Sequence, residues 1–310
     1  MAASKARSPG AFRAAVQTVR FLLRPQNRGL VLTAAVIVAA VTGSIYAWRR
    51  WGQPAMRSAE YVVTPERITV TPQPTWIHSN VKAEVLRSVG AQQFDLHDRK
   101  LVEQLAQAFV LNPWVNNVIR IQKRFPAQVD VELQYRRPVM VVKLDAPEEQ
   151  GLLFLDAASI LLPSADFAPS QAKSYLRIMA SGETPAGIYG TPWGSERIAG
   201  AARIAAAWSN RWQPLGLYWI VAARSAGGEL VYELRTQDDK VRVVWGVAAG
   251  HESTGEPSVE QKIAALEQYV RDKGPLSRDG APSLIDLREL AGSAAKTARL
   301  KGGAQPSNRR

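Results

Sequence analysis

The sequence predicts an α+β protein with three parts: an N-terminal transmembrane helix, a small β-α-α-β-β domain, and a mixed β-sheet domain with flanking helices. Three observations support this prediction. No charged residue occurs from Gly29 to Trp48. Short alternating strands and amphipathic helical segments fill residues 67–135. Further strand-like segments, interrupted by helical ones, continue to Leu287.

The uncharged segment has the length and composition of a membrane-spanning helix. At about 1.5 Å per residue it spans close to the ~30 Å hydrocarbon core of a bilayer. Aromatic residues suited to the headgroup region lie at its C-terminal end: Tyr46, Trp48 and Trp51. Basic residues without any acid precede it. We therefore expect a single-pass type II protein of the inner (cytoplasmic) membrane, with a cytoplasmic N-terminus and its bulk on the extracytoplasmic, periplasmic side.

Two other interpretations of this segment are weaker. A buried helix of a soluble protein would carry polar positions on one face, and this segment has no charged stripe. A cleaved signal peptide has a shorter leader than residues 1–28 and a small-residue cleavage site. We expect a basic tail over 1–28, an uncleaved transmembrane helix over 29–49 and a linker over 50–66.

The net charge of +12 is concentrated at the ends of the chain. Residues 1–28, the pair Arg49-Arg50 and residues 293–310 hold thirteen basic residues and no acid, which leaves residues 51–292 at −1. This distribution argues against a basic groove for nucleic acid in the folded domains. The N-terminal charges indicate membrane orientation instead.

The first exported segment predicts the order β-α-α-β-β. A short strand over 68–70 precedes a helix over 80–89 that ends at Gly90. A second helix, over 98–109, is expected to be capped by Asp95 or Asp98. Alternating apolar residues then predict two strands: Ile119 and Ile121, followed by Val129, Val131 and Leu133.

The remaining chain predicts a β-rich domain. Strands are expected over these ranges: 138–143, 152–155, 160–162, 217–222, 230–235, 241–245 and 283–287. An Ala-rich helix over about 193–210 follows a proline-containing region without a predicted strand. Ser258 and Gln261 form a capping box before a second helix. The polar tail beyond Leu300 is expected to be disordered.

No catalytic constellation stands out. The absence of cysteine excludes disulfides, thiol nucleophiles and Cys-ligated metals, and three histidines make a His-rich metal site improbable. Four features have simpler explanations as loop, turn, capping or surface residues: Gly187–Gly190, Asp238-Asp239, His97 and Arg136-Arg137. We expect no enzyme, no cofactor and no nucleic-acid partner. Binding by strand addition to a sheet edge is the natural mode for such a protein.

The order of these segments resembles the FtsQ/DivIB family of bacterial cell-division proteins, which have a POTRA domain and a C-terminal β domain. The resemblance rests on these segments: Phe94–Leu96, Asn112–Val115, Val118–Pro126, Val129–Val131, Arg136–Val141, Leu155-Asp156, Leu230–Leu234, Val241–Gly246, Gln261–Ile263 and Ile285–Arg288. It departs from the family at Tyr135, where Glu is frequent, and at Ala158, where the family has a hairpin glycine. Glu289 replaces a common aromatic residue, and no tryptophan follows Gly292.

The resemblance implies a POTRA-like domain over 67–136, a β domain over 137–299 and a disordered basic tail over 300–310. It also implies a non-enzymatic divisome scaffold at the division septum, which links early and late division proteins and helps control septal peptidoglycan synthesis. The implied partners are small bitopic proteins similar to FtsB and FtsL, and the septal synthase complex. The implied strand-addition residues are Asp286, Leu287, Arg288, Glu289, Gly292, Ser293, Ala294 and Ala295.

Alternatives remain open at this point. Residues 292–299 are small and acid-free, and they either form a weak strand edge or begin the disordered tail. POTRA units also occur in transport and secretion components, although the long amphipathic strands of such proteins are not evident after residue 145. Another exported membrane-anchored binding protein, or an exported hydrolase with an unrecognised acid pair, are further candidates.

Overall fold

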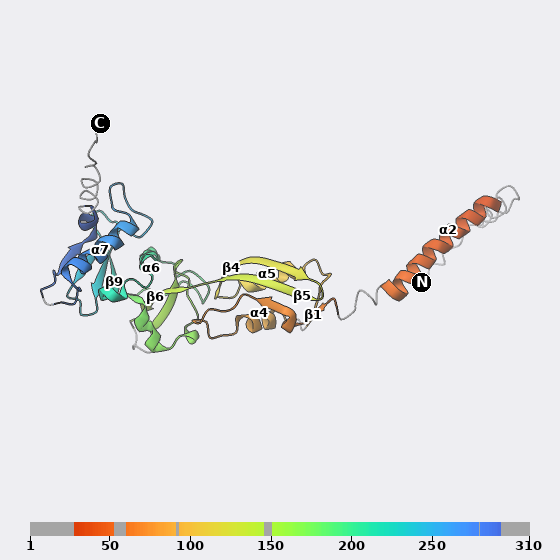
Figure 1. Ribbon diagram of the computed structural model, residues 1–310, viewed down its shortest axis with the longest axis horizontal. Coiled ribbons are helices and arrows are strands. Elements are labelled where there is room, and N and C mark those ends of the chain that lie inside the picture. Colours follow the sequence, from red (N-terminus) through yellow and green to blue (C-terminus); the bar gives the residue numbers. More distant parts are fainter. Residues whose placement is uncertain (1–27, 53–59, 91–92, 146–150, 279, 293–310) are drawn as a thin grey trace, which may run out of the picture. The chain divides into compact units, whose positions relative to one another are not determined.

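The computed structural model describes residues 28–52, 60–90, 93–145, 151–278 and 280–292. The fold is α+β, as predicted, with an apolar helix near the N-terminus and several sheets (Figure 1). The chain divides into two compact units. The first contains residues 1–67, 93–98 and 123–128, and the second contains residues 68–92, 99–122 and 129–310.

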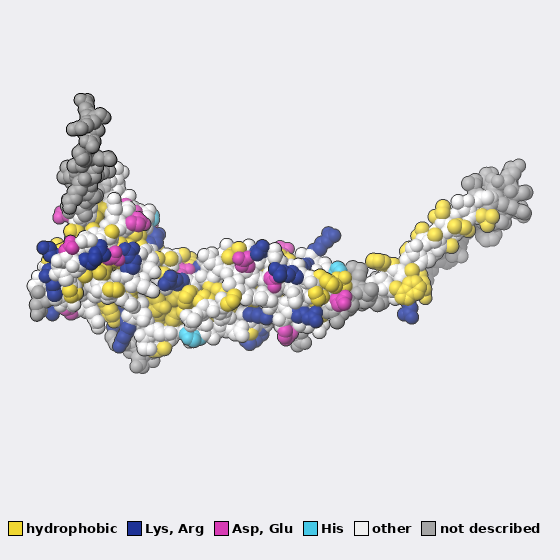
Figure 2. All heavy atoms as spheres, viewed as in Figure 1, with side chains coloured by type: hydrophobic (Ala, Val, Ile, Leu, Met, Phe, Trp, Pro, Cys, Tyr) yellow, Lys and Arg dark blue, Asp and Glu magenta, His cyan; other side chains and the backbone are white. Residues whose placement is uncertain are grey.

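The first unit contains helix α2, Arg28–Ala47, which continues as a π-helical turn over Trp48–Gly52. The stretch Leu32–Gly52 is long and apolar enough to cross a membrane. Its side chains are not buried inside the protein, and Figure 2 shows charged side chains only at its end. These properties agree with the predicted anchor.

The first unit also holds a small two-stranded sheet of β1, Val62–Val63, and β3, Phe94–Asp95. The two strands are antiparallel, with Val63 opposite Phe94. Lys123 reinforces this region because its Nζ donates to the carbonyls of Leu96 and Asp98. The sequence did not predict this sheet, since two-residue strands leave no periodicity to detect.

In the second unit, the predicted order strand, helix, helix, strand, strand is present. Its elements are β2 (Ile68–Val70), α4 (Val81–Val89), α5 (Leu101–Val110), β4 (Val115–Arg124) and β5 (Gln128–Tyr135). The three strands form one sheet in the order β2-β5-β4. Helices α4 and α5 pack on each other and bury apolar stripes: Val81, Val85, Leu86, Leu101, Leu105 and Phe109.

Of the caps predicted for these helices, one is confirmed: Gly90 ends α4 in the left-handed region. At the start of α4, Asn80 accepts from the Ala83 N–H at 2.9 Å, a cap that the sequence analysis did not name. The cap predicted for α5 was wrong: neither Asp95 nor Asp98 caps it, because the helix begins at Leu101 after Lys100, which makes no side-chain cap. The Asp95 carboxylate accepts from the His97 N–H in the preceding turn instead.

A seven-stranded sheet follows, in the order β12-β11-β10-β9-β8-β6-β7. Its strands are β6 (Pro138–Lys143), β7 (Leu152–Asp156), β8 (Leu176–Met179), β9 (Leu217–Arg224), β10 (Leu230–Thr236), β11 (Arg242–Gly246) and β12 (Leu284–Asp286). The sheet is mixed: β12 is parallel to β11, and β8 is parallel to both β6 and β9. The sequence missed β8, which is short, lies among prolines and depends on distant partners.

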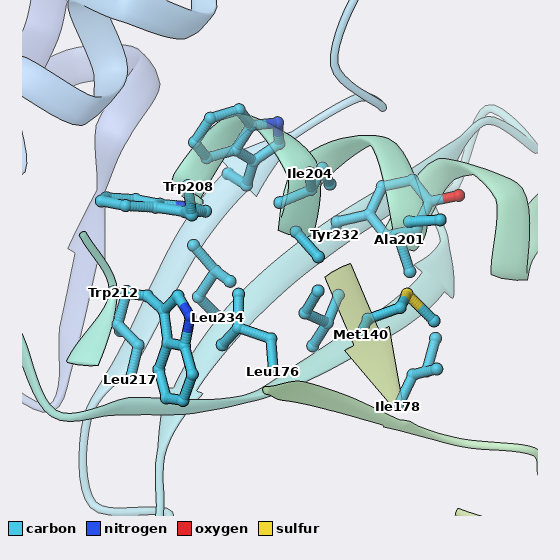
Figure 3. Close-up of a cluster of buried hydrophobic side chains, with 14 of the residues drawn as sticks. Met140, Leu176, Ile178, Ala201, Ile204, Trp208, Trp212, Leu217, Tyr232 and Leu234 are labelled. Atoms are coloured by element: carbon cyan, nitrogen blue, oxygen red, sulfur yellow. The ribbon is translucent and has the colours of Figure 1, made fainter. Parts of the chain in front are cut away.

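Helices α6, Glu196–Trp208, and α7, Val259–Lys273, supply the core beneath this sheet. Figure 3 shows Ala201, Ile204 and Trp208 of α6 facing side chains from the strands. These strand residues are Met140, Leu176, Ile178, Leu217, Tyr232 and Leu234. The Ser258 capping box of α7 is confirmed, since Ser258 and Gln261 exchange side-chain to backbone hydrogen bonds.

The turn after β7 has its left-handed residue one position beyond Ala158. The predicted hairpin forms, because Leu155 bridges Leu161 in an antiparallel pair. The left-handed residue of its turn is Ser159, with φ +58°, rather than Ala158. The Asp156 carboxylate stabilises this turn by accepting the N–H groups of Ala158 and Ile160 at 2.9 and 2.8 Å.

Candidate functional site

The strand β12 forms one end of the seven-stranded sheet. It pairs in parallel with β11, with Ile285 opposite Val243. On its other side no strand lies against it within the described ranges. An edge of this kind presents unpaired backbone groups to which another chain can add.

The direction of the free backbone groups follows from one hydrogen bond. The Ser283 carbonyl accepts from the Arg242 N–H at 2.9 Å, so Ser283 points toward β11. Successive residues of a strand point their N–H and C=O groups to opposite sides. The N–H and C=O groups of Leu284 and the N–H of Asp286 therefore point to the open side of the sheet.

An ion pair marks the C-terminal end of this edge. Arg288 Nε lies 3.0 Å from Asp286 Oδ1, and the Arg288 backbone N–H donates to the same oxygen at 2.9 Å. Partial burial raises the pKa of the Asp286 carboxyl, but the Arg288 hydrogen bonds outweigh it and hold this pKa below its usual value. Asp286 is therefore a charged acceptor beside a half-exposed guanidinium.

The predicted strand-addition residues lie in different secondary structures. Asp286 lies in β12, whereas Leu287, Arg288, Glu289 and Gly292 lie in a helical segment over 287–292. The prediction that the strand continues through Leu287 is wrong. Asp286 accepts the Arg288 N–H as an N-cap, and Leu287 and Ala291 are buried at helical spacing. Ser293, Ala294 and Ala295 lie outside the described residues.

Accessibility further separates these residues. Leu287 is fully buried and belongs to the core, so a partner cannot contact its side chain directly. Arg288 and Glu289 are exposed. Leu284, which the sequence analysis did not single out, is 56% exposed at the edge. Strand alternation could have indicated this exposure, because a buried Ile285 places the side chains of Leu284 and Asp286 on the opposite face of the sheet.

A separate open cavity of about 800 Å³ lies in the second unit. Aromatic residues, amides and two arginines dominate its lining: Trp76, Tyr135, Tyr175, Trp212, Asn116, Gln134, Asn210, Gln213, Arg136 and Arg137. Several of these side chains are held in place. Trp76 Nε1 donates to the Arg136 carbonyl at 3.1 Å, and the Tyr135 hydroxyl donates to the Thr71 carbonyl at 2.8 Å.

The acidic side chain of this cavity forms an ion pair with one of its arginines. Asp156 is the one carboxylate among its lining residues, and its Oδ2 lies 2.8 Å from Arg136 Nη1, with both side chains largely buried. The Asp156 oxygens are thus occupied by Arg136 and by the N–H groups of Ala158 and Ile160. Arg137 is exposed beside Tyr175, whose pKa is raised by burial against the opposing effect of the Arg137 charge.

The other residues considered from the sequence have local roles. The His97 ring contacts Asp95 at 3.2 Å and lies at a tilt of 41° to the Tyr61 ring, with the ring centres 4.4 Å apart. Asp238 accepts from the Thr236 hydroxyl inside a turn. Within the described ranges, no group of three or more His, Cys, Asp or Glu residues is arranged to hold a metal.

No protein-family model matches the sequence, and no curated protein matches it significantly.

Proposed function

We propose that this chain is a single-pass membrane scaffold that binds partner proteins by strand addition to the β12 edge. The open side of β12, with the outward N–H and C=O of Leu284 and the outward N–H of Asp286, is the observation that carries the proposal. The helix over Leu32–Gly52 supports membrane anchoring.

The resemblance to FtsQ/DivIB proteins supplies the finer part of this proposal. It suggests a divisome role at the septum, with FtsB- and FtsL-like partners and an effect on septal peptidoglycan synthesis. Depletion of the protein should then block septation and produce filaments or enlarged cells. Normal division during depletion would contradict a divisome role without affecting the strand-addition proposal.

A substitution at the edge tests strand addition directly. Leu284→Pro removes one outward N–H, while the hydrogen bond from Arg242 to Ser283 is retained, so the sheet should keep its fold. The matched control Leu284→Val keeps the N–H and an apolar side chain. Tagged full-length protein, purified from its host in detergent, is compared for the recovery of small single-pass membrane proteins.

We expect Leu284→Pro to reduce recovery at least about tenfold, because strand addition depends on backbone hydrogen bonds. The control should retain recovery near the unsubstituted level. Equal recovery with both variants, at equal protein accumulation, would rule out the β12 edge as the contact.

A further inference from the structure

Lys262, in the first turn of α7, is an unusual core residue. Its side chain is 0% exposed, although lysine is almost never fully buried without a partner. Its Nζ lies 2.6 Å from Glu256 Oε1 and 5.0 Å from the centre of the Trp245 ring. Replacing such a buried pair by apolar residues is often neutral or stabilising, so stability alone gives a weak explanation for it.

The Glu256 carboxylate reaches Lys262 by passing close to Gly246, the last residue of β11. Gly246 has φ +101°, and a Cβ at this position would lie 2.2 Å from Glu256 Oε1. The same Cβ would lie 3.2 Å from Arg288 Cδ. Glu256 and Arg288 therefore pack against one glycine, which leaves the space that both side chains need.

Four side chains of alternating charge thus run from the core to the sheet edge. They are Lys262, Glu256, Arg288 and Asp286. The Asp286 hydrogen bonds have the largest effect in raising the pKa of the Arg288 guanidinium, and the Glu256 charge raises it further. Glu256 is consequently a second anion within electrostatic reach of Arg288.

We propose that the buried Lys262–Glu256 pair is a positioning element for the open edge. Lys262 engages the Glu256 carboxylate and prevents it from competing with Asp286 for Arg288. Glu256 in turn holds the Arg288 stem against Gly246. The charged end of β12 is therefore set by a fully buried lysine and a largely buried glutamate. This inference deepens the proposed strand-addition function and rests on it for the role of the edge.

The test uses full-length protein in detergent micelles and needs no partner. The Arg288 Nε–H resonance is followed by ¹⁵N NMR and assigned with an Arg288→Lys variant. Hydrogen exchange of the backbone amides over 284–292 is measured by mass spectrometry. The variants are Lys262→Met, Glu256→Gln and the two combined, and the matched control is Glu260→Gln, an exposed residue near the start of α7.

Lys262→Met should free Glu256 to bind Arg288. We expect the Arg288 resonance to shift and exchange at the Arg288 amide to rise about tenfold, because its bond to Asp286 is weakened. Exchange in α6 should not change. Adding Glu256→Gln removes the competing charge and should bring the Arg288 resonance to the position that it has in Glu256→Gln alone. Glu260→Gln should leave it in place.

The single variant Glu256→Gln covers the case in which Lys262→Met fails to fold, and it too should move the Arg288 resonance. An unchanged resonance in folded Glu256→Gln would overturn the positioning role, as would a uniform rise in exchange over the whole chain. Because no partner is involved, that result would leave strand addition standing. Conversely, unaffected partner recovery with Leu284→Pro would overturn strand addition. It would not change the interpretation of the Arg288 resonance or of the hydrogen exchange.

Discussion

Asp166 illustrates how one carboxylate can organise residues far apart in the sequence. Its Oδ1 accepts the Ser79 N–H at 2.7 Å, and its Oδ2 accepts the Ser79 hydroxyl at 2.9 Å and Trp114 Nε1 at 2.5 Å. The His78 ring contacts its backbone carbonyl at 2.8 Å. Asp166 is almost completely buried, so these donors depend on it for their hydrogen bonds.

We predict that Asp166→Asn lowers the free energy of unfolding by about 1–3 kcal/mol, because one acceptor oxygen becomes a donor facing buried donors. Chemical denaturation of the full chain in detergent measures this change. The exposed residue Glu229 provides the control, and Glu229→Gln should alter stability by less than about 0.5 kcal/mol. Equal effects of the two substitutions would show that the Asp166 bonds contribute little.

At the scale of elements, the fit of α6 on the sheet depends on Gly200. A Cβ on Gly200 would lie 2.0 Å from the Tyr232 hydroxyl oxygen and 2.5 Å from its ring. The Tyr232 hydroxyl in turn lies 3.2 Å from the carbonyls of Glu196 and Arg197, where it donates to the first turn of α6. The absence of a side chain at Gly200 thus lets the Tyr232 side chain of β10 pack closely against α6.

We predict that Gly200→Ala destabilises the protein by about 1–3 kcal/mol through overpacking, although alanine favours helices by about 1 kcal/mol over glycine. Thermal or denaturant unfolding measures the effect. Combining Gly200→Ala with Tyr232→Phe removes the nearest atom and should recover part of the loss. A stabilised Gly200→Ala variant would mean that α6 moves away from β10 at no cost.

At the scale of the whole molecule, the proposed orientation places the second unit outside the cytoplasm. The chain has no cysteine, so introduced cysteines report their side of the membrane without background. Ile188 is 80% exposed in the second unit, and Ser8 lies in the N-terminal segment. These two positions provide a matched pair for labelling.

We predict that a membrane-impermeant maleimide labels the Ile188→Cys variant once the reagent reaches the extracytoplasmic side of the inner membrane. The Ser8→Cys variant should react only after the membrane is disrupted, because six basic residues favour retention of the N-terminus inside. The reverse pattern would invert the proposed topology, and labelling of both variants from outside would contradict a single span.

Local patterns in the sequence determined many elements of this protein. The charge-free stretch predicted α2, the apolar spacing predicted α4, and Ser258 with Gln261 predicted the start of α7. These signals are short-range, since helix periodicity and capping involve residues within a few positions of each other. The cap of α5 was missed because competing turn bonds at Asp95 left several possible starts.

The sequence by itself determined the apolar helix, the order of most strands and helices, and the region that holds the candidate edge. Only the tertiary structure decided that β8 joins the sheet, that the chain turns helical after Asp286, and that Glu256 links Lys262 to the neighbourhood of Arg288. The first and last of these features depend on contacts between residues far apart in the chain. At Asp286, continuation of strand β12 competes with a helix that the Asp286 side chain caps. The pairing of β8 and the Glu256 link gain their free energy from partners that only folding brings together, so no local pattern encodes them.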